Sequence, residues 1–189
     1  MRRKWLFASI LAIVLMLLTA CGQFHSKEDN GQNASPDPVS EPPQEEVQTY
    51  AVELYFADAD LMHLYKVERE VQAEEEDELP LETLKLWIQG PEQEELAGLI
   101  PTDVEVKDLK IAEGLATVNF SEEILKANVG STGELFILDS LALILKQFDA
   151  DQVQILVNGE TVETLYGHIK VEEPYSYEDD RNYDIKIFQ

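Results

Sequence analysis

The sequence predicts an α/β domain of the α+β kind, in which a small mixed sheet of about five to six strands carries two helices on one face. Short segments that alternate apolar and polar side chains, as half-buried strands do, recur between residues 52 and 166. Two longer segments repeat their apolar residues every three or four positions, which is the period of a helix.

The first two strands are predicted at residues 52–56, which are rich in aromatic and β-branched side chains, and at residues 64–71, which alternate apolar and charged side chains. Five consecutive acids follow, from Glu74 to Glu78. They could attract a divalent cation, but adjacent acids do not converge on one point as the spaced ligands of a Ca²⁺ loop do. We therefore expect a solvated loop that leads into a helix.

The first helix is predicted between Pro80, which suits the first turn, and the stop signal Gly90-Pro91. Trp87 could serve as a platform for a ligand. It belongs, however, to an apolar stripe at helical spacing, which favours burial in the core. The stripe consists of Leu81, Leu84, Trp87 and Ile88.

A hairpin is predicted after the loop at residues 99–101. In residues 104–111 the apolar side chains lie first at even and then at odd positions. Because successive side chains of a strand point to opposite faces, this change predicts a bulge near Lys107 and Asp108. Glu113-Gly114 is predicted to turn the chain into a returning strand at residues 116–120.

The second helix is expected to form the centre of the core. Ser131 and Glu134 have the spacing of a capping box, in which each side chain accepts a hydrogen bond from a backbone N–H at the helix start. The apolar stripe is broad enough to serve alternatively as a seam for self-association. It consists of Leu135, Phe136, Leu138, Leu141, Ala142, Leu143, Ile144, Leu145 and Phe148.

The last predicted strands are residues 153–157 and 160–166, joined by the hairpin signal Asn158-Gly159. Residues 171–189 form an acidic extension that is rich in tyrosine. We expect this extension to be loosely packed, and the alternative is a tail that docks in the groove of a partner. Its aromatic residues are Tyr175, Tyr177, Tyr183 and Phe188.

The N-terminus predicts export and a lipid anchor. Residues 2–4 are basic, residues 5–18 are uncharged and apolar, and residues 18–21 read Leu-Thr-Ala-Cys, the pattern of a lipobox. We therefore expect a signal peptide at residues 1–20, diacylglycerol on Cys21, and a disordered polar linker over residues 21–48. The alternative is a permanent transmembrane anchor. Both interpretations place the domain at the cell membrane, on its extracytoplasmic face.

Charge limits the partners. Removal of the predicted signal leaves 11 basic and 38 acidic residues, a net charge of −27. This charge disfavours nucleic acid and anionic lipid surfaces, which require the opposite sign. It is compatible with a basic partner or a cation-rich cell wall.

The sequence predicts no enzyme, no catalytic residues, no cofactor and no metal. The histidines, His25, His63 and His168, lack metal-ligand spacing, and residues 130–133 read Gly-Ser-Thr-Gly, without the Gly-x-Ser-x-Gly pattern of a nucleophile elbow.

A series of short segments occurs in order along the chain: Leu54 to Phe56, Val67 to Val71, Leu84 to Pro91, Leu99 to Pro101, Gly114 to Ser121, Gly130 and Ser131 with Glu134, Val157 to Gly159, and Leu165 to His168. With these segments, residues 52 to about 170 resemble the GerMN domain, which is named from a sporulation and germination protein of endospore-forming bacteria. The chain departs from the family in two ways. Family members often carry two such domains, whereas one is recognised here. Residues 141–146, in the second predicted helix, lack the threonine that related chains commonly have before the final leucine of this segment.

The resemblance implies a GerMN-like domain at residues 49–170, similar to the ring-building modules of secretion-type channels and carried on extracytoplasmic lipoproteins without enzymatic activity. The function expected from it is protein–protein assembly at the envelope in sporulation or germination, with other envelope or spore-membrane proteins or with further copies of the chain as partners. The alternatives are binding of a small ligand, wall fragment or cation, and a hydrolase.

Overall fold

The structure, a computed structural model, describes residues 47–188. Cys21, the predicted signal peptide and nearly all of the predicted linker lie outside the described residues. Within the described part of the chain, none of the helices combines the length and the apolar character needed to cross a membrane.

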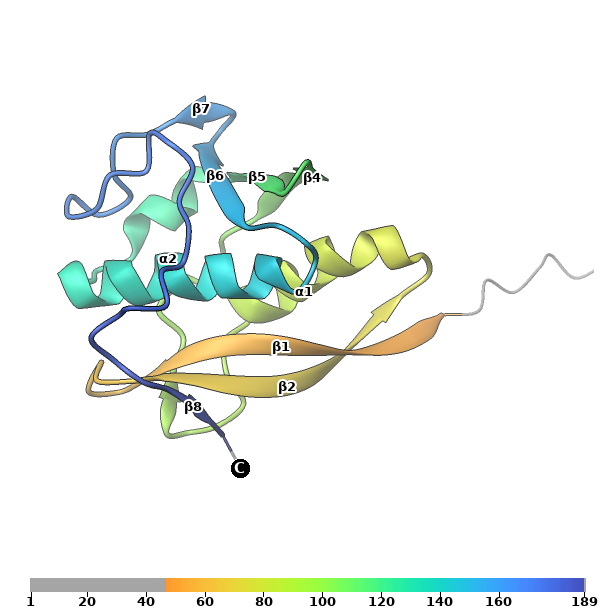
Figure 1. The fold of residues 1–189 in the computed structure, drawn as a ribbon, viewed down its shortest axis with the longest axis horizontal. Helices are drawn as coiled ribbons and strands as arrows, with labels where there is room; N and C mark the ends of the chain where they lie inside the picture. The colour runs from red at the N-terminus through yellow and green to blue at the C-terminus, as the bar shows by residue number, and fades with distance from the viewer. Residues whose placement is uncertain (1–46, 189) are drawn as a thin grey trace, which may run out of the picture. The chain divides into compact units, whose positions relative to one another are not determined.

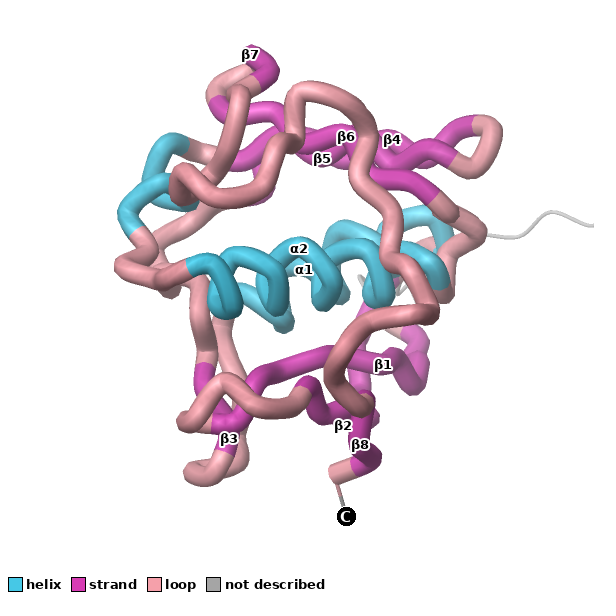
Figure 2. The backbone as a smooth tube through the Cα atoms, turned by 60° about the vertical axis from the view of Figure 1, so that its left-hand side comes forward, coloured by secondary structure: helices cyan, strands magenta, loops and turns pink. Residues whose placement is uncertain are grey.

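The described strands form two four-stranded sheets, with the helices α1 (Leu79–Ile88) and α2 (Ser131–Lys146) between them (Figures 1 and 2). The α+β class with two helices is confirmed. One mixed sheet was expected from the sequence, whereas the structure divides the strands between two sheets. The reason lies in α2, of whose 16 residues 11 are buried, because a helix that is apolar on nearly all sides needs a layer on both sides.

The first sheet is built on the antiparallel pair of β1 (Gln48–Asp58) and β2 (Leu64–Ala73). Both predicted strands are confirmed and are longer than expected. The short strand β3 (Leu96–Ala97) pairs antiparallel with the end of β1, and β8 (Ile185–Ile187) pairs parallel with the start of β2. With two and three residues, β3 and β8 are too short for an alternating pattern to reveal them.

The second sheet contains β4 (Val106–Ala112), β5 (Leu115–Phe120), β6 (Gln152–Val157) and β7 (Glu160–Thr161), in that order. The pairing of β4 with β5 shifts between Val106 and Asp108, which confirms the predicted bulge. The predicted turn is also confirmed, because Glu113 and Gly114 both have positive φ, 52° and 79°.

The strand predicted over residues 160–166 is wrong beyond Thr161, where β7 ends. Leu165 turns into the core, and the backbone N–H of Tyr166 is bound by the carboxylate of Glu134 instead of by a strand.

The helices fill the space between the sheets. Trp87 is 5% exposed, and its indole N–H donates to the Tyr55 carbonyl at 3.0 Å, which confirms the core interpretation of this residue. Leu81 was expected on the buried face of α1 but is only half-buried, whereas Leu79 and Thr83 take part in that face.

The outward edge of β1 is completed by a side chain. Gln147, which follows α2, accepts a hydrogen bond from the Glu53 N–H at 3.0 Å and donates one to the Glu53 carbonyl at 2.9 Å. The amide thus makes both hydrogen bonds that a neighbouring strand would make there.

The C-terminal residues are packed, so the expectation of a loose extension is wrong. Val171 is buried, and the backbone of Tyr175 exchanges two hydrogen bonds with that of Val153, at 2.7 and 2.8 Å. The chain then crosses from the second sheet to the first and ends beside β2 as β8 (Figure 1).

Candidate functional site

Two carboxylates lie on the buried surface of α2. Glu134 and Asp139 are both 0% exposed. Burial of a charged group costs several kcal/mol unless hydrogen bonds or ion pairs compensate for it, so the partners of these two residues decide their role.

Glu134 does not form the predicted capping box. Gly130 is the residue before the helix, and no side chain caps the first turn. The two oxygens of Glu134 instead accept hydrogen bonds from the backbone N–H groups of Tyr166, at 3.0 Å, and His168, at 2.9 Å. The prediction failed because Glu134 faces the interior, where a distant loop competes for its carboxylate, whereas Ser131 is exposed.

The same loop is held a second time by Tyr166. Its hydroxyl donates to the Ile124 carbonyl at 2.7 Å, within a 3₁₀ turn at Glu122–Lys126. Burial, together with the negative charge of Glu134, raises the pKa of Tyr166 above its usual value. Glu134 and Tyr166 therefore fix residues 162–170 against α2 and the 3₁₀ turn.

Asp139 gathers three side chains from the C-terminal residues. Its carboxylate accepts hydrogen bonds from the hydroxyls of Tyr175, at 2.5 Å, and Tyr183, at 2.6 Å, and from the Arg181 guanidinium at 3.0 Å. Arg181 also donates to the Tyr175 hydroxyl at 2.7 Å. Burial and then the hydrogen bonds to Asp139 raise the pKa values of both tyrosines.

The tyrosines were among the residues singled out in the sequence, whereas Asp139 was not. A signal was present, because a lone carboxylate next to Leu138 in a stripe of apolar residues predicts a buried charge that needs partners.

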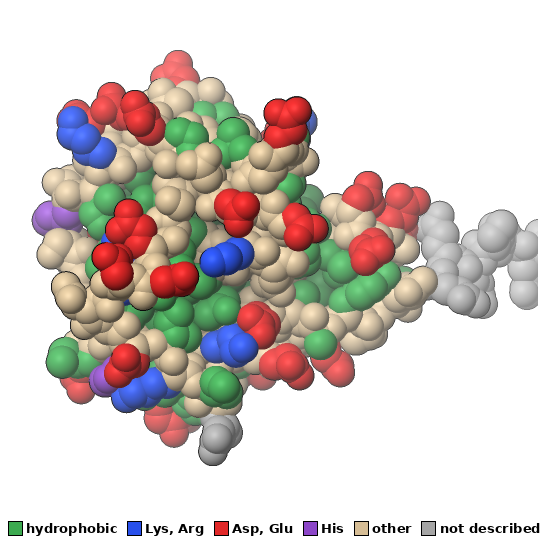
Figure 3. Space-filling view, viewed as in Figure 1, with side chains coloured by type: hydrophobic (Ala, Val, Ile, Leu, Met, Phe, Trp, Pro, Cys, Tyr) green, Lys and Arg blue, Asp and Glu red, His purple; other side chains and the backbone are tan. Residues whose placement is uncertain are grey.

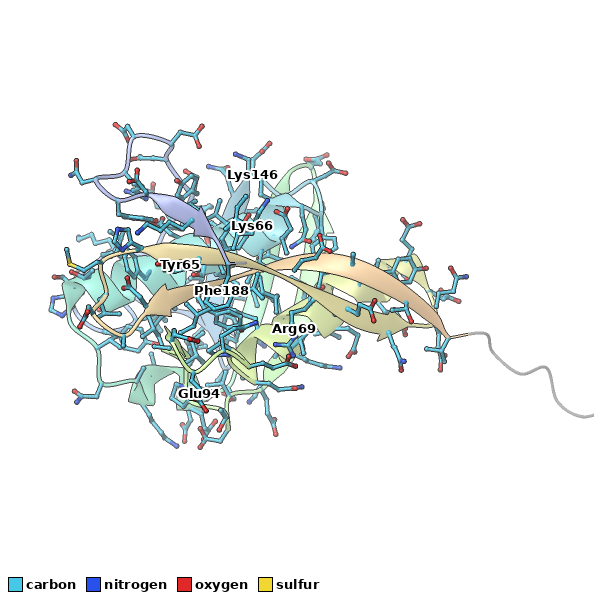
Figure 4. The ribbon with its side chains drawn as sticks, turned by 90° about the horizontal axis from the view of Figure 1, so that it is seen from below. Tyr65, Lys66, Arg69, Glu94, Lys146 and Phe188 are labelled. Atoms are coloured by element: carbon cyan, nitrogen blue, oxygen red, sulfur yellow. The ribbon has the colours of Figure 1, made fainter. Side chains whose placement is uncertain are left out.

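The last described residue, Phe188, packs on β2. The Phe188 N–H donates to the Lys66 carbonyl at 3.0 Å, and the Phe188 ring lies edge-on to Tyr65 with 6.0 Å between ring centroids. Figure 4 shows these two aromatic side chains together. Tyr175, Tyr183 and Phe188 thus all contact their own domain.

The described histidines lie apart. His63 Nδ1 is 3.0 Å from Asp58 Oδ2 at the turn between β1 and β2. Burial opposes the charge of Asp58, but hydrogen bonds from His63 and Met62 outweigh it and lower the pKa of Asp58. His168 lies in the loop that Glu134 binds. Over residues 47–188, no three His, Cys, Asp or Glu side chains are grouped so that they could hold a metal ion, and the acids at residues 76–78 are exposed.

Comparison with known proteins places this geometry in a family. Among solved structures, a candidate lipoprotein from Clostridium perfringens is 26% identical, with 69% of this chain and 89% of that chain covered, at a TM-score of 0.52. The tandem GerMN domains of the sporulation protein GerM from Bacillus subtilis are 22% identical over 68% of this chain, at a TM-score of 0.54. The alignment spans 46% of that tandem chain.

The first GerMN domain of the same protein is 23% identical, with 67% of this chain and 94% of that chain covered, at a TM-score of 0.51. A search of curated proteins gives no match. The model of the Germane family, described as "Sporulation and spore germination", matches residues 53–163, more than half of the chain. The chain therefore belongs to this sporulation and spore germination family and contains a GerMN domain.

Proposed function

We propose that this chain is a lipid-anchored protein on the extracytoplasmic face of the cell membrane, where its GerMN domain assembles with other envelope proteins in sporulation or spore germination. The observation that carries the proposal is the order of parts in one chain: a signal-type segment over residues 1–20, Cys21, a polar linker, and the family domain. The similarity to a candidate lipoprotein supports the anchor.

The role that we propose is not enzymatic. Catalytic carboxylates need access to a substrate. Glu134 and Asp139 are fully buried, and their oxygens accept hydrogen bonds from the protein's own backbone, from two tyrosines and from Arg181. Both carboxylates thus act in holding the fold together.

Crosslinking followed by pull-down of the full-length protein tests the proposal, with membranes from vegetative and from sporulating cells. The matched control is Cys21→Ala, which we expect to leave the membrane fraction. Partners recovered with the anchored protein and lost with the control would support assembly at the membrane. Membrane retention of the control, or the absence of any partner for the correctly located protein, would contradict it.

The net charge of −27 on the chain without its predicted signal favours a second candidate function, binding of a cation or a wall fragment. A ligand that binds the folded state raises the melting temperature. A rise with Ca²⁺ or with wall fragments, absent with Na⁺ at matched ionic strength, would support this alternative.

A further inference from the structure

An apolar groove lies where α1 begins. Its floor combines Pro80 and Leu81 of α1, Leu109 and Ile111 of β4, and Phe148 beyond α2. All five side chains are half-buried, and the groove has a volume of about 600 Å³. Within the described residues β4 is the outer strand of its sheet, so one of its edges carries no paired strand.

Four exposed acidic residues that line the groove form its rim. Glu76, Asp77 and Glu78 precede the body of α1, and Asp149 follows α2. All four are exposed, and no Lys, Arg or His lines the groove or forms an ion pair with them among the described residues. Figure 3 shows apolar surface bordered by acidic groups at the end of the domain where α1 begins.

Asp149 occupies an unfavourable position. Its φ is +62°, and its N–H donates to the Lys146 carbonyl as part of the end of α2. Glycine or asparagine is usual at such a position, and the end of a helix carries partial negative charge that disfavours an acid. Acids at the start of α1 interact favourably with the dipole of that helix, whereas an acid after the end of α2 interacts unfavourably with the dipole of α2. Exceptions to local preferences concentrate at functional sites.

The negative charge of the rim decides which segment can bind in the groove. The linker at residues 22–46 contains six acids and one lysine, and a second copy of the mature chain has a net charge of −27, so the rim repels both. We propose that the groove binds a basic segment of another envelope protein, which seats an apolar side chain on the floor and turns lysines or arginines toward the rim. This inference rests on the proposed assembly function.

The test uses the full-length protein in nanodiscs of zwitterionic lipid and a short fluorescent peptide that alternates lysine and leucine. Two control peptides replace leucine by serine or lysine by glutamate. We expect saturable binding of the first peptide, weakening with salt, and little binding of either control. Equal binding of the serine peptide, or no binding of the first peptide at physiological salt, would overturn the proposal.

Two double variants with the same charge change locate the binding. Asp77→Asn with Asp149→Asn removes two rim charges, and Glu172→Gln with Glu173→Gln removes two exposed charges that do not line the groove. We expect the rim variant to weaken peptide binding about fivefold and the control variant less than about twofold, as for two modest ion pairs. Equal weakening would show attraction by bulk charge and overturn the proposal.

Pull-down with the rim variant separates this inference from the assembly function. Partners lost with the rim variant and kept by the control variant support the groove. Partners kept by both would overturn the groove and leave assembly intact. An empty pull-down from the unmodified protein together with specific peptide binding would contradict the assembly function while the groove stands.

Discussion

Asp139 Oδ2 accepts a hydrogen bond of 2.6 Å from the hydroxyl of Tyr183, a residue 44 positions further along the chain. The Tyr183 ring also packs edge-on against Phe136 of α2, with 4.7 Å between centroids. One tyrosine thus satisfies a buried charge and covers a buried ring. The C-terminal residues therefore belong to the stability of the domain and not to a free tail.

Asp139→Ala is expected to release the C-terminal residues. The change leaves Arg181 without its buried counterion, and loss of one partner of a buried pair costs about 3–5 kcal/mol. We expect the lower end of this range, because Arg181 retains Glu178 at 3.6 Å. Urea unfolding measures the loss, and hydrogen exchange should show faster exchange at β8. Asp184→Ala, an exposed acid in the same segment, is the control and should change stability by less than about 0.5 kcal/mol.

Two alanine substitutions distinguish the observed role of Glu134 from a capping box. Glu134→Ala leaves the N–H groups of Tyr166 and His168 without their acceptor, which should cost about 2 kcal/mol or more. Ser131→Ala should cost less than about 0.5 kcal/mol, because the serine is exposed and makes no capping bond. Thermal and urea unfolding of both variants supply the comparison. A loss of stability near 1 kcal/mol for Ser131→Ala would instead support the capping-box interpretation.

Local patterns predicted the elements whose cause is local. The bulge near Asp108, the turn at Gly114 and the buried stripe of α2 follow from periodicity and turn chemistry, which short stretches of sequence contain. The roles of Glu134 and Asp139 depend on partners more than 30 residues away, which no local pattern specifies. The division into two sheets likewise depends on tertiary packing, because α2 has to be covered on both sides.

High pH should destabilise the domain through Tyr175 and Tyr183. Burial and the hydrogen bonds to Asp139 raise their pKa values above the ordinary 10.0. A raised native-state pKa means that the stabilisation is complete below the unfolded pKa and is lost as pH rises through the native value. We expect the melting temperature to decline from about pH 10 upward. The doubly substituted Tyr175→Phe, Tyr183→Phe protein should decline less steeply, and parallel profiles would contradict this assignment.

Asp149→Gly tests whether the acid beside the groove is kept at a cost in stability. Glycine adopts the positive φ of this position without strain, and the change removes a negative charge from the end of α2. We expect the free energy of unfolding to rise by about 0.5–1 kcal/mol, measured by urea unfolding at low salt.

The same Asp149→Gly variant should bind the lysine–leucine peptide more weakly, because one rim charge is lost. Asp179→Gly, at an exposed acid outside the groove, is the control and should leave peptide binding unchanged. Opposite effects on stability and binding would show that Asp149 serves the groove and not the fold. A variant that is less stable than the original protein would instead assign Asp149 a structural role.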